Sequence, residues 1–277
     1  MENWRLFEKQ SVSYLNKIFS DSDFNFIHEG GSNSEAPDIG VKNRVGKNLF
    51  NIEAKLSPSQ SGQFVIKESS GKYNLTKLSK LSNPFSQEII DYLNMKSNDY
   101  LGFTSGVKEV NCDINLLINW VKSHYSSKHV FFIITSDSLD SFKSIIQMDE
   151  LEKYFKVTAC VRRKKSGTSH LPKSLFTFGL NKVKIHLKSI NEQFISFTNE
   201  NKKTIVEIKN TKDVIKKSDR YFGENLFLSP EDKMGQYSVK RTSSTNNINV
   251  IFSLIYIGER ENMGEDKLKK SLMSVNK

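Results

Sequence analysis

Cysteine is scarce in this chain, and its two cysteines do not form a recognisable pair. Cys112 and Cys160 lie far apart and belong to no CxxC or Cys/His spacing. This spacing argues against a structural zinc site and against a disulfide framework. We therefore expect both thiols to be small core residues.

Long hydrophobic runs are also missing. Hydrophobic residues make up 37% of the chain and the mean hydropathy is -0.49, and no apolar run approaches the roughly 20 residues of a bilayer crossing. The first five residues lack the pattern of a signal peptide. We expect a cytoplasmic protein without a membrane partner. Its 277 residues suffice for one large domain or for a domain with a second lobe.

Acidic residues are outnumbered by basic ones. The chain has 41 Lys and Arg against 31 Asp and Glu, which gives a net charge of +10. Such a surplus attracts polyanions, and nucleic acid is the leading candidate, although a membrane surface or a generally basic proteome would also account for it. The densest basic segment is Arg162-Arg163-Lys164-Lys165, which runs on through Ser166 to His170.

Two acids and a lysine stand in a spacing that suits metal-dependent chemistry. Asp38 follows a proline, and Glu53-Ala54-Lys55 follows about fifteen residues later in an apolar run. The pattern predicts a hairpin of strands over 38–41 and 49–55. Because side chains alternate along a strand, Glu53 and Lys55 share one face. If Asp38 ends the neighbouring strand, the two carboxylates can hold one Mg²⁺ beside the lysine.

Each of these motifs also has an ordinary interpretation. A Pro-Asp pair usually belongs to a turn, and a Glu-x-Lys on a strand is usually a solvated pair. Their combination at hairpin spacing in a basic protein favours a metal-dependent phosphodiesterase. Two accessory candidates stay open. Glu8 either faces this site or lies at the surface, and Gln63 either contacts DNA or belongs to a flexible turn over 60–63.

The remaining pattern is that of an α/β protein. We predict an amphipathic helix over 4–19. Further expected elements are helices over 83–95 and 114–125, strands over 24–28, 129–135, 157–161, 235–241 and 248–257, a hairpin over 194–209, a turn over 242–247, and a frayed or helical tail over 258–277.

Colinear motifs along nearly the whole chain resemble a known family. The matching segments are Asn3-Trp4 with Phe7-Glu8, Asp38-Ile39, Ile52 to Lys55, Gly62 to Val65, Lys164 to Gly167 with His170-Leu171, and Asn249 to Ser253. In their order and spacing they resemble type II restriction endonucleases with a PD-(D/E)xK nuclease core that recognise the palindrome GCGC.

The resemblance implies Mg²⁺-dependent cleavage of double-stranded DNA at GCGC. It also implies a mixed central sheet flanked by helices, with residues 1–155 as the nuclease core and 156–277 as a basic, β-rich DNA-recognition region, either packed on the core or continuous with it. Asp38, Glu53 and Lys55 match the motif's two metal ligands and its lysine, with Glu8 and Gln63 as accessory candidates. A companion DNA methyltransferase would protect the host DNA, and the oligomeric state, monomer or homodimer, stays open. Base recognition needs hydrogen-bonding groups in the major groove, for which Arg and Lys are the commonest. The DNA-binding candidates are Gln63, Arg162, Arg163, Lys164, Lys165, Ser166, His170, Lys240, Arg241 and Asn247.

Two other classes of function remain open on the sequence. A PD-(D/E)xK nuclease of repair or recombination would keep the metal site but recognise DNA structure instead of sequence. A non-catalytic basic DNA-binding protein would keep only the charge.

Overall fold

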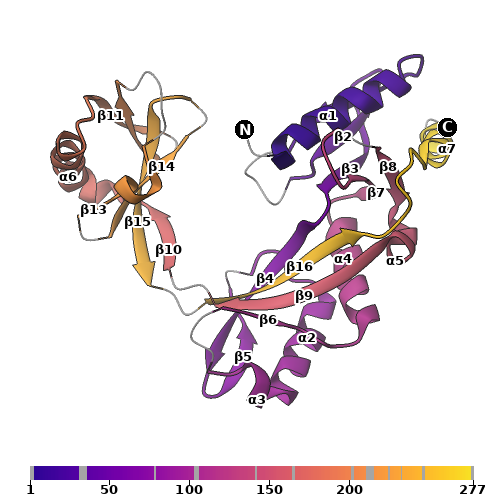
Figure 1. The fold of residues 1–277 in the computed structure, drawn as a ribbon, viewed down its shortest axis with the longest axis horizontal. Coiled ribbons are helices and arrows are strands. Elements are labelled where there is room, and N and C mark those ends of the chain that lie inside the picture. The colour runs from indigo at the N-terminus through magenta and orange to yellow at the C-terminus, as the bar shows by residue number, and fades with distance from the viewer. Residues whose placement is uncertain are drawn as a thin grey trace. The chain divides into compact units, whose positions relative to one another are not determined.

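The chain forms two compact units. Unit 1 comprises Met1–Arg163 and Asn247–Lys277, and unit 2 comprises Lys164–Asn246 (Figure 1). The structure is a computed structural model, and it describes residues 3–30, 36–77, 79–102, 106–140, 142–163, 166–200, 203–209, 215–223, 225–231, 233–244 and 247–275.

The first sheet of unit 1 is mixed and has the strand order β1-β2-β3-β7-β8. Its strands are β1 (Phe24–His28), β2 (Ile39–Asn43), β3 (Asn48–Leu56), β7 (Val130–Ser136) and β8 (Ser144–Gln147). The pair β3–β7 is parallel and the other pairs are antiparallel. Helices α1 (Asn3–Ile18) and α7 (Glu265–Val275) pack against this sheet.

The second sheet of unit 1 is antiparallel, with the order β5-β4-β16-β9-β6. Its strands are β4 (Ser59–Ser69), β5 (Lys72–Leu75), β6 (Val107–Glu109), β9 (Phe155–Arg163) and β16 (Asn247–Tyr256). Helices α2 (Pro84–Met95) and α4 (Ile114–Ser126) pack against it. Since β4 begins three residues after β3 ends, one nearly continuous stretch of chain connects the two sheets.

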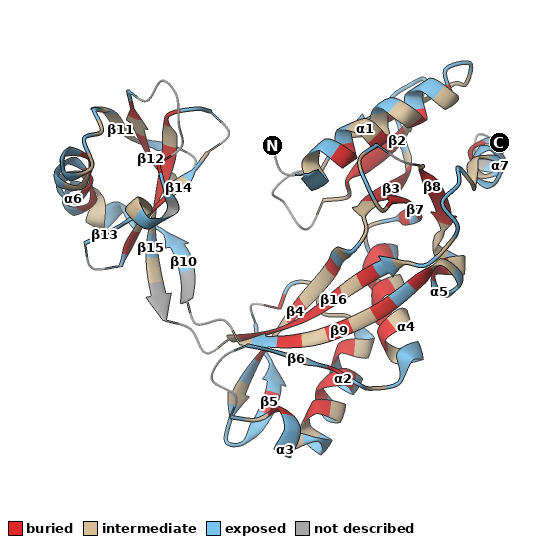
Figure 2. Ribbon diagram, viewed as in Figure 1, coloured by how far each residue is buried: buried red, intermediate tan, exposed pale blue. Residues whose placement is uncertain are grey.

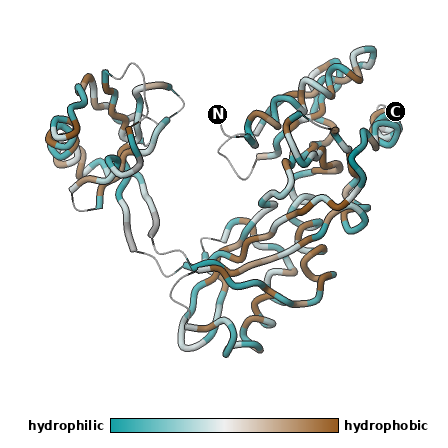
Figure 3. The backbone as a smooth tube through the Cα atoms, viewed as in Figure 1, coloured by the Kyte–Doolittle hydropathy of each residue, from teal (hydrophilic) through white to brown (hydrophobic). Residues whose placement is uncertain are grey.

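Hydrophobic burial explains why both sheets form. Leu117, Trp120 and Val121 recur at helical spacing and form the buried face of α4. Residues of β9 alternate between buried and partly exposed, as expected for a strand with one face in the core (Figure 2). Strand β16 is largely apolar (Figure 3), and it is buried over most of its length. Ring stacking adds to this core, since Trp120 and Phe252 lie 3.7 Å apart between centroids.

Unit 2 is a sheet packed against one helix. The strand order is β11-β12-β15-β14-β13, and β10 pairs with β15. The strands are β10 (Ser166–His170), β11 (Phe194–Glu200), β12 (Lys203–Ile208), β13 (Tyr221–Phe222), β14 (Leu226–Pro230) and β15 (Gln236–Ser244). Helix α6 (Phe176–Ser189) contributes Val183 and Leu187 to a core that includes Val206, Leu228 and Val239.

The short helices complete the element list. They are α3 (Ser97–Tyr100), α5 (Leu151–Tyr154), and the 3₁₀ turns η1 (Met148–Glu150), η2 (Lys173–Leu175) and η3 (Lys217–Arg220). Within the described residues, no helix is both long and apolar enough to cross a membrane.

Much of the predicted α/β pattern is confirmed. The hairpin of β2 and β3, helices α1, α2 and α4, and the hairpin of β11 and β12 lie where the sequence predicts them. The predicted tail contains helix α7. The expectation of one central sheet was incomplete, because unit 1 holds two sheets and the chain passes from one to the other between β3 and β4, between β6 and β7, and between β8 and β9.

The open alternative of a flexible turn over 60–63 and the predicted turn over 242–247 were both wrong. Residues 60–63 belong to strand β4, because Gln63 pairs with Ile251 and Gly62 with Phe252. Most of 242–247 is also strand, since β15 runs on to Ser244 opposite Ser166. Both segments are rich in small polar residues, and their strand partners lie far away in sequence. The sequence-based division at 155/156 also differs from the contacts, which place β9 and β16 in unit 1.

The prediction for the cysteines was only partly right. Cys112 and Cys160 are free thiols, as expected, but both are half-buried instead of lying in the core. Burial raises the pKa of each thiol, so neither is an activated nucleophile.

Gly62 offers a test of how tightly the second sheet packs. A Cβ there would lie 3.0 Å from the Trp120 ring and 3.2 Å from His124, and φ is +146°. Gly71 also has a positive φ, +70°, but nothing within 4 Å. Because overpacking costs about 1–3 kcal/mol, Gly62→Ala should lower the free energy of unfolding by that much more than Gly71→Ala. Urea denaturation of both variants measures this difference. Equal losses in the free energy of unfolding would show that Gly62 is not tightly packed against Trp120.

Candidate active site

The predicted catalytic residues meet in one place. Asp38 directly precedes β2, and Glu53 and Lys55 lie on β3, where the register sets Ile39 opposite Ile52. Antiparallel pairing therefore brings the start of β2 beside the end of β3, as expected for the predicted hairpin. The backbone N–H of Ala54 donates to Asp38 Oδ2 at 3.0 Å, which fixes the Asp38 carboxylate against β3.

Lys55 bridges the two acids. Its Nζ lies 2.7 Å from Glu53 Oε1 and 3.4 Å from Asp38 Oδ2. Burial alone would lower the pKa of Lys55, but Glu53 and Asp38 outweigh it and raise that pKa well above its usual value. Lys55 is therefore an ammonium ion at neutral pH. Burial raises the pKa of Glu53, and Lys55 opposes that rise.

Glu53 has an unused acceptor. The residue is only 4% exposed, and its Oε2 has no hydrogen-bond partner among the described residues. A buried carboxylate oxygen without a donor is costly unless a cation or a donor reaches it. Within the described residues, His, Cys, Asp and Glu side chains do not form a cluster of three or more that could hold a metal ion. Mg²⁺, however, is commonly bound by one or two carboxylates together with substrate phosphates and water, and Asp38 with Glu53 fits that requirement.

The cluster opens into a cavity of about 390 Å³. Glu8 lines it from α1, and Gln63 lines it from β4. Glu8 is buried and hydrogen-bonded to His28, 2.8 Å away. The alternative that Glu8 lies at the surface is thus wrong. Gln63 accepts a hydrogen bond at Oε1 from Asn249 Nδ2, at 3.1 Å.

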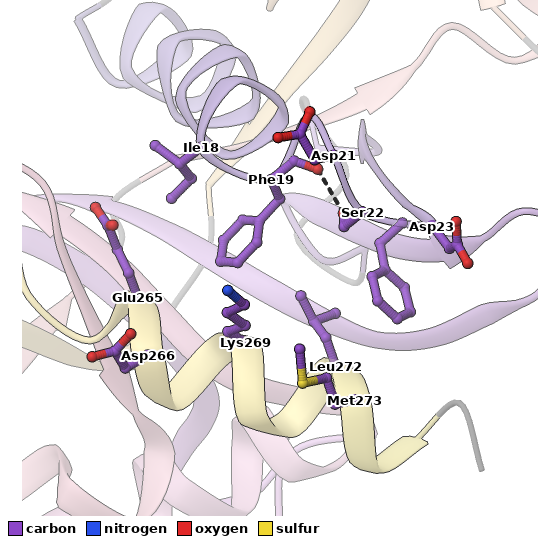
Figure 4. A pocket seen from close by; sticks show the side chains of 11 residues that line it. Ile18, Phe19, Asp21, Ser22, Asp23, Glu265, Asp266, Lys269, Leu272 and Met273 are labelled. Carbon is purple, nitrogen blue, oxygen red and sulfur yellow. Dashed lines mark hydrogen bonds between the residues drawn. The ribbon is translucent and has the colours of Figure 1, made fainter.

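A larger cavity, of about 680 Å³, lies elsewhere in unit 1. It is bordered by the end of α1 and by α7, with Phe19, Lys269 and Leu272 among its walls (Figure 4). The described residues that line it include none of the predicted site residues.

The structure divides the predicted DNA-binding residues between the two units. Gln63, Arg162, Arg163 and Asn247 belong to unit 1, whereas Ser166, His170, Lys240 and Arg241 belong to unit 2. Arg163 forms an ion pair with Glu68 at 2.5 Å, and Lys240 donates to Ser229 at 3.1 Å. His170 pairs with Lys240, and Ser169 with Arg241, between β10 and β15. Lys164 and Lys165 lie outside the described residues, as does the Ser166 side chain.

Three residues that lie next to the predicted site were not singled out by the sequence analysis. His28 bonds Glu8, His124 lines the cavity, and Gly30 lies against both Glu8 and Asp38. The signal for His124 was present, because it follows Trp120 by four residues and so shares its helical face. No sequence signal placed His28 and Gly30, because His28 meets Glu8 through the packing of α1 on β1, and Gly30 meets Asp38 just beyond the pairing of β1 with β2.

Comparison with known proteins fits this geometry. No protein-family model matches the chain, and no curated protein matches it in sequence. A solved structure of HhaI endonuclease in complex with DNA matches with a TM-score of 0.72 and 28% identity, over 99% of each chain. The chain is therefore similar to HhaI endonuclease in fold over nearly its whole length, and the resemblance found in the sequence is confirmed to that extent. Both units lie within the matched length, so the similarity is not confined to the cluster around Lys55.

His124 gives the site a measurable pH dependence. Burial lowers the pKa of His124 to about 3, and Lys128 and Lys55 lower it further. Below about pH 6.5, His124 is protonated in the unfolded chain but stays neutral in the folded protein. The contribution of neutral His124 to the free energy of unfolding is therefore complete above pH 6.5. As the pH falls, this contribution decreases by about 1.4 kcal/mol per pH unit, until the pKa of His124 in the folded protein is reached.

We expect the wild type to lose about 2 kcal/mol more than His124→Gln between pH 6.5 and 5. Urea denaturation of both proteins at the two pH values measures this difference, and the remaining titrating groups cancel in the comparison. Parallel pH profiles would contradict a neutral, buried imidazole.

Proposed function

We propose that this protein is a type II restriction endonuclease that hydrolyses phosphodiester bonds of double-stranded DNA at GCGC, with Mg²⁺ as cofactor. The observation that carries the proposal is the buried arrangement of Asp38, Glu53 and Lys55 at one cavity. The HhaI structure that the chain matches is bound to DNA, which supports DNA as the substrate. The sequence motifs described above support GCGC as the site.

Asp38 and Glu53 are the proposed ligands of the metal ion. Their carboxylates converge on Lys55, and Glu53 Oε2 is available to a cation. A bound Mg²⁺ would offset the negative charge of the phosphate and lower the pKa of a bound water.

Lys55 acts as a donor in this proposal. Because its pKa is raised well above the usual value, it holds its proton and is poorly suited to be the general base. Its ammonium group can orient the attacking water or clamp the scissile phosphate, whose non-bridging oxygens gain charge during in-line attack. Ala54 holds Asp38 through its backbone N–H, so the carboxylate is oriented before DNA binds.

The charge of unit 2 supports a DNA-binding role for that part of the chain. Lys164–Asn246 contains 16 of the 41 Lys and Arg residues and 8 of the 31 Asp and Glu residues, and so has a net charge of +8 out of +10. Phosphate contacts made by such a surface provide affinity, and base-edge contacts provide specificity. We assign the predicted recognition role to Arg162 to His170 and to the strand containing Lys240 and Arg241, with Gln63 and Asn247 as further candidates.

One digestion separates this proposal from the two alternatives. Plasmid DNA incubated with the protein and Mg²⁺ should give discrete bands whose ends map to GCGC. Structure-dependent nicking would instead indicate a repair or recombination nuclease, and intact plasmid would indicate a binding protein. The proposal also implies a companion methyltransferase that protects host DNA. Monomer and homodimer both remain compatible with it.

Removal of a site residue should separate cleavage from binding. We expect Asp38→Ala, Glu53→Gln and Lys55→Ala each to reduce the rate on GCGC plasmid by at least about 10²-fold, as loss of one electrostatic contribution typically does. Binding of a GCGC duplex without metal should stay within a few-fold of wild type. Lys122→Ala is a suitable control, because it removes a surface ion pair with Glu152. Near wild-type cutting by the three site variants would refute the assignment.

Variants in the basic segment test the recognition role. If each lysine contacts a base edge, Lys164→Ala and Lys165→Ala should each reduce the discrimination between GCGC and a site with one base changed. The loss should be about 1–3 kcal/mol in the difference between the activation free energies of cleavage at the two sites. Lys188→Ala, in α6, serves as a control of equal charge. An equal loss of cleavage on both sequences would mean that these lysines contact phosphates only. In that case the slope of log affinity against log salt concentration should also fall by about one.

A further inference from the structure

Lys128 is a second lysine on the wall of the candidate active site. It lines the same cavity as Glu53 and Lys55, and it lies in the short turn between α4 and β7. Burial is the main cause of the pKa shifts of Glu53 and His124, and the positive charge of Lys128 acts to lower both of these pKa values. The ammonium group of Lys128 is therefore close enough to act on charges inside the cavity.

A buried asparagine of the catalytic strand fixes the backbone at Lys128. Asn51 lies on β3, two residues before Glu53, and is only 5% exposed. Its Nδ2 donates to the carbonyl of Lys128 at 2.6 Å, and its backbone N–H donates to the carbonyl of His129 at 2.8 Å. The N–H of Lys128 in turn donates to the carbonyl of Tyr125 at 3.0 Å. The strand that carries the candidate catalytic residues thus also holds the turn that carries Lys128.

The substrate brings a charge that Lys55 meets only in part. The ammonium group of Lys55 is shared between Glu53 and Asp38, at 2.7 and 3.4 Å, so much of its charge is balanced within the protein. A phosphodiester is negatively charged, and its non-bridging oxygens gain more negative charge as water attacks in line. Donors that are already in place stabilise such charge best. Two lysines are among the described residues that line the cavity, and Lys128 is the second.

We propose that Lys128 is a second cationic group of the reaction, which donates to a non-bridging oxygen of the phosphate under attack. This inference rests on the proposed function and adds to it a residue that contacts the substrate. Lys55 then serves chiefly to hold the two carboxylates and the attacking water, and Lys128 stabilises the charge that develops on the phosphate. Removal of one such donor typically slows a reaction about 10²–10³-fold.

The simpler explanation is that Lys128 only stabilises α4. A cation just beyond the C-terminus of a helix interacts favourably with the helix dipole, and that role would affect the free energy of unfolding and not the rate of cleavage. Lys122 is a matched control on the same helix. Its ammonium group donates to the carbonyl of Asp149 at 3.0 Å and pairs with Glu152 at 2.6 Å, and Lys122 is not among the described residues that line the cavity.

The test measures cleavage of a GCGC duplex by an excess of the full-length protein with saturating Mg²⁺, so that the rate is that of the bound complex. Lys128→Gln should lower this rate about 10²–10³-fold. Lys128→Arg, which keeps the charge, should recover part of the loss, and Lys122→Gln should cut at the wild-type rate.

Two binding measurements separate this role from others. The Kd for Mn²⁺ without DNA, measured by electron paramagnetic resonance, should not rise in Lys128→Gln, because the change removes a like charge near the cation. The Kd for the duplex without metal should rise only a few-fold.

A wild-type rate for Lys128→Gln, or a loss confined to duplex affinity or to the free energy of unfolding, would overturn the inference. A Kd for Mn²⁺ that rises as much as the rate falls would also overturn it, since the loss would then act through the metal. Asp38→Ala distinguishes these results from failure of the proposed function. If Asp38→Ala no longer cuts while Lys128→Gln cuts like wild type, only the role of Lys128 fails. If wild type does not cut the duplex with Mg²⁺, the proposed function itself fails.

Discussion

The ammonium group of Lys55, held between Glu53 and Asp38, is the interaction on which the site depends. Two carboxylates cannot be buried side by side without a compensating charge, and Lys55 supplies it at 2.7 and 3.4 Å. The same contacts keep the lysine protonated. The first sheet holds these groups at fixed distances, because the Ile39–Ile52 register fixes where β2 begins relative to the end of β3. A shift of one residue would turn Glu53 and Lys55 to the opposite face.

The second sheet forms the opposite wall of the cavity and is anchored by aromatic packing. Trp120 stacks on Phe252, and its Nε1 donates to Ser86 Oγ at 2.8 Å. Gly62 lies directly against the same indole. Because β4 follows β3 almost immediately, this packing positions Gln60 to Gln63 beside Lys55. The candidate catalytic residues and the proposed DNA contact Gln63 therefore lie on two different sheets, close to the short connection between β3 and β4.

How much the sequence predicted depended on how local each interaction is. The β2–β3 hairpin and the grouping of Asp38, Glu53 and Lys55 could be predicted, because alternation and a short polar connection determine them. Strand β4 could not, because Ser, Gln and Gly at 59–63 are typical of turns and become a strand only by pairing with β16, nearly 190 residues later. The boundary at 155/156 differs from the division into two units for the same reason, since β9 pairs with β16. The His28–Glu8 contact requires the packing of α1 on β1, which no spacing indicates.

The pairing of β9 with β16 also shows how the chain accommodates unit 2. Arg163 and Ile248 are opposite each other in the ladder, so the chain leaves unit 1 and returns to it at adjacent points. The segment that joins β9 to β16 therefore starts and ends at neighbouring positions. The entropic cost of closing a loop between two such positions grows only slowly with the length of the loop. A two-residue turn would satisfy the same ladder. The register of the second sheet thus does not depend on what joins these two strands, and unit 2 is an insertion between neighbouring strands of unit 1.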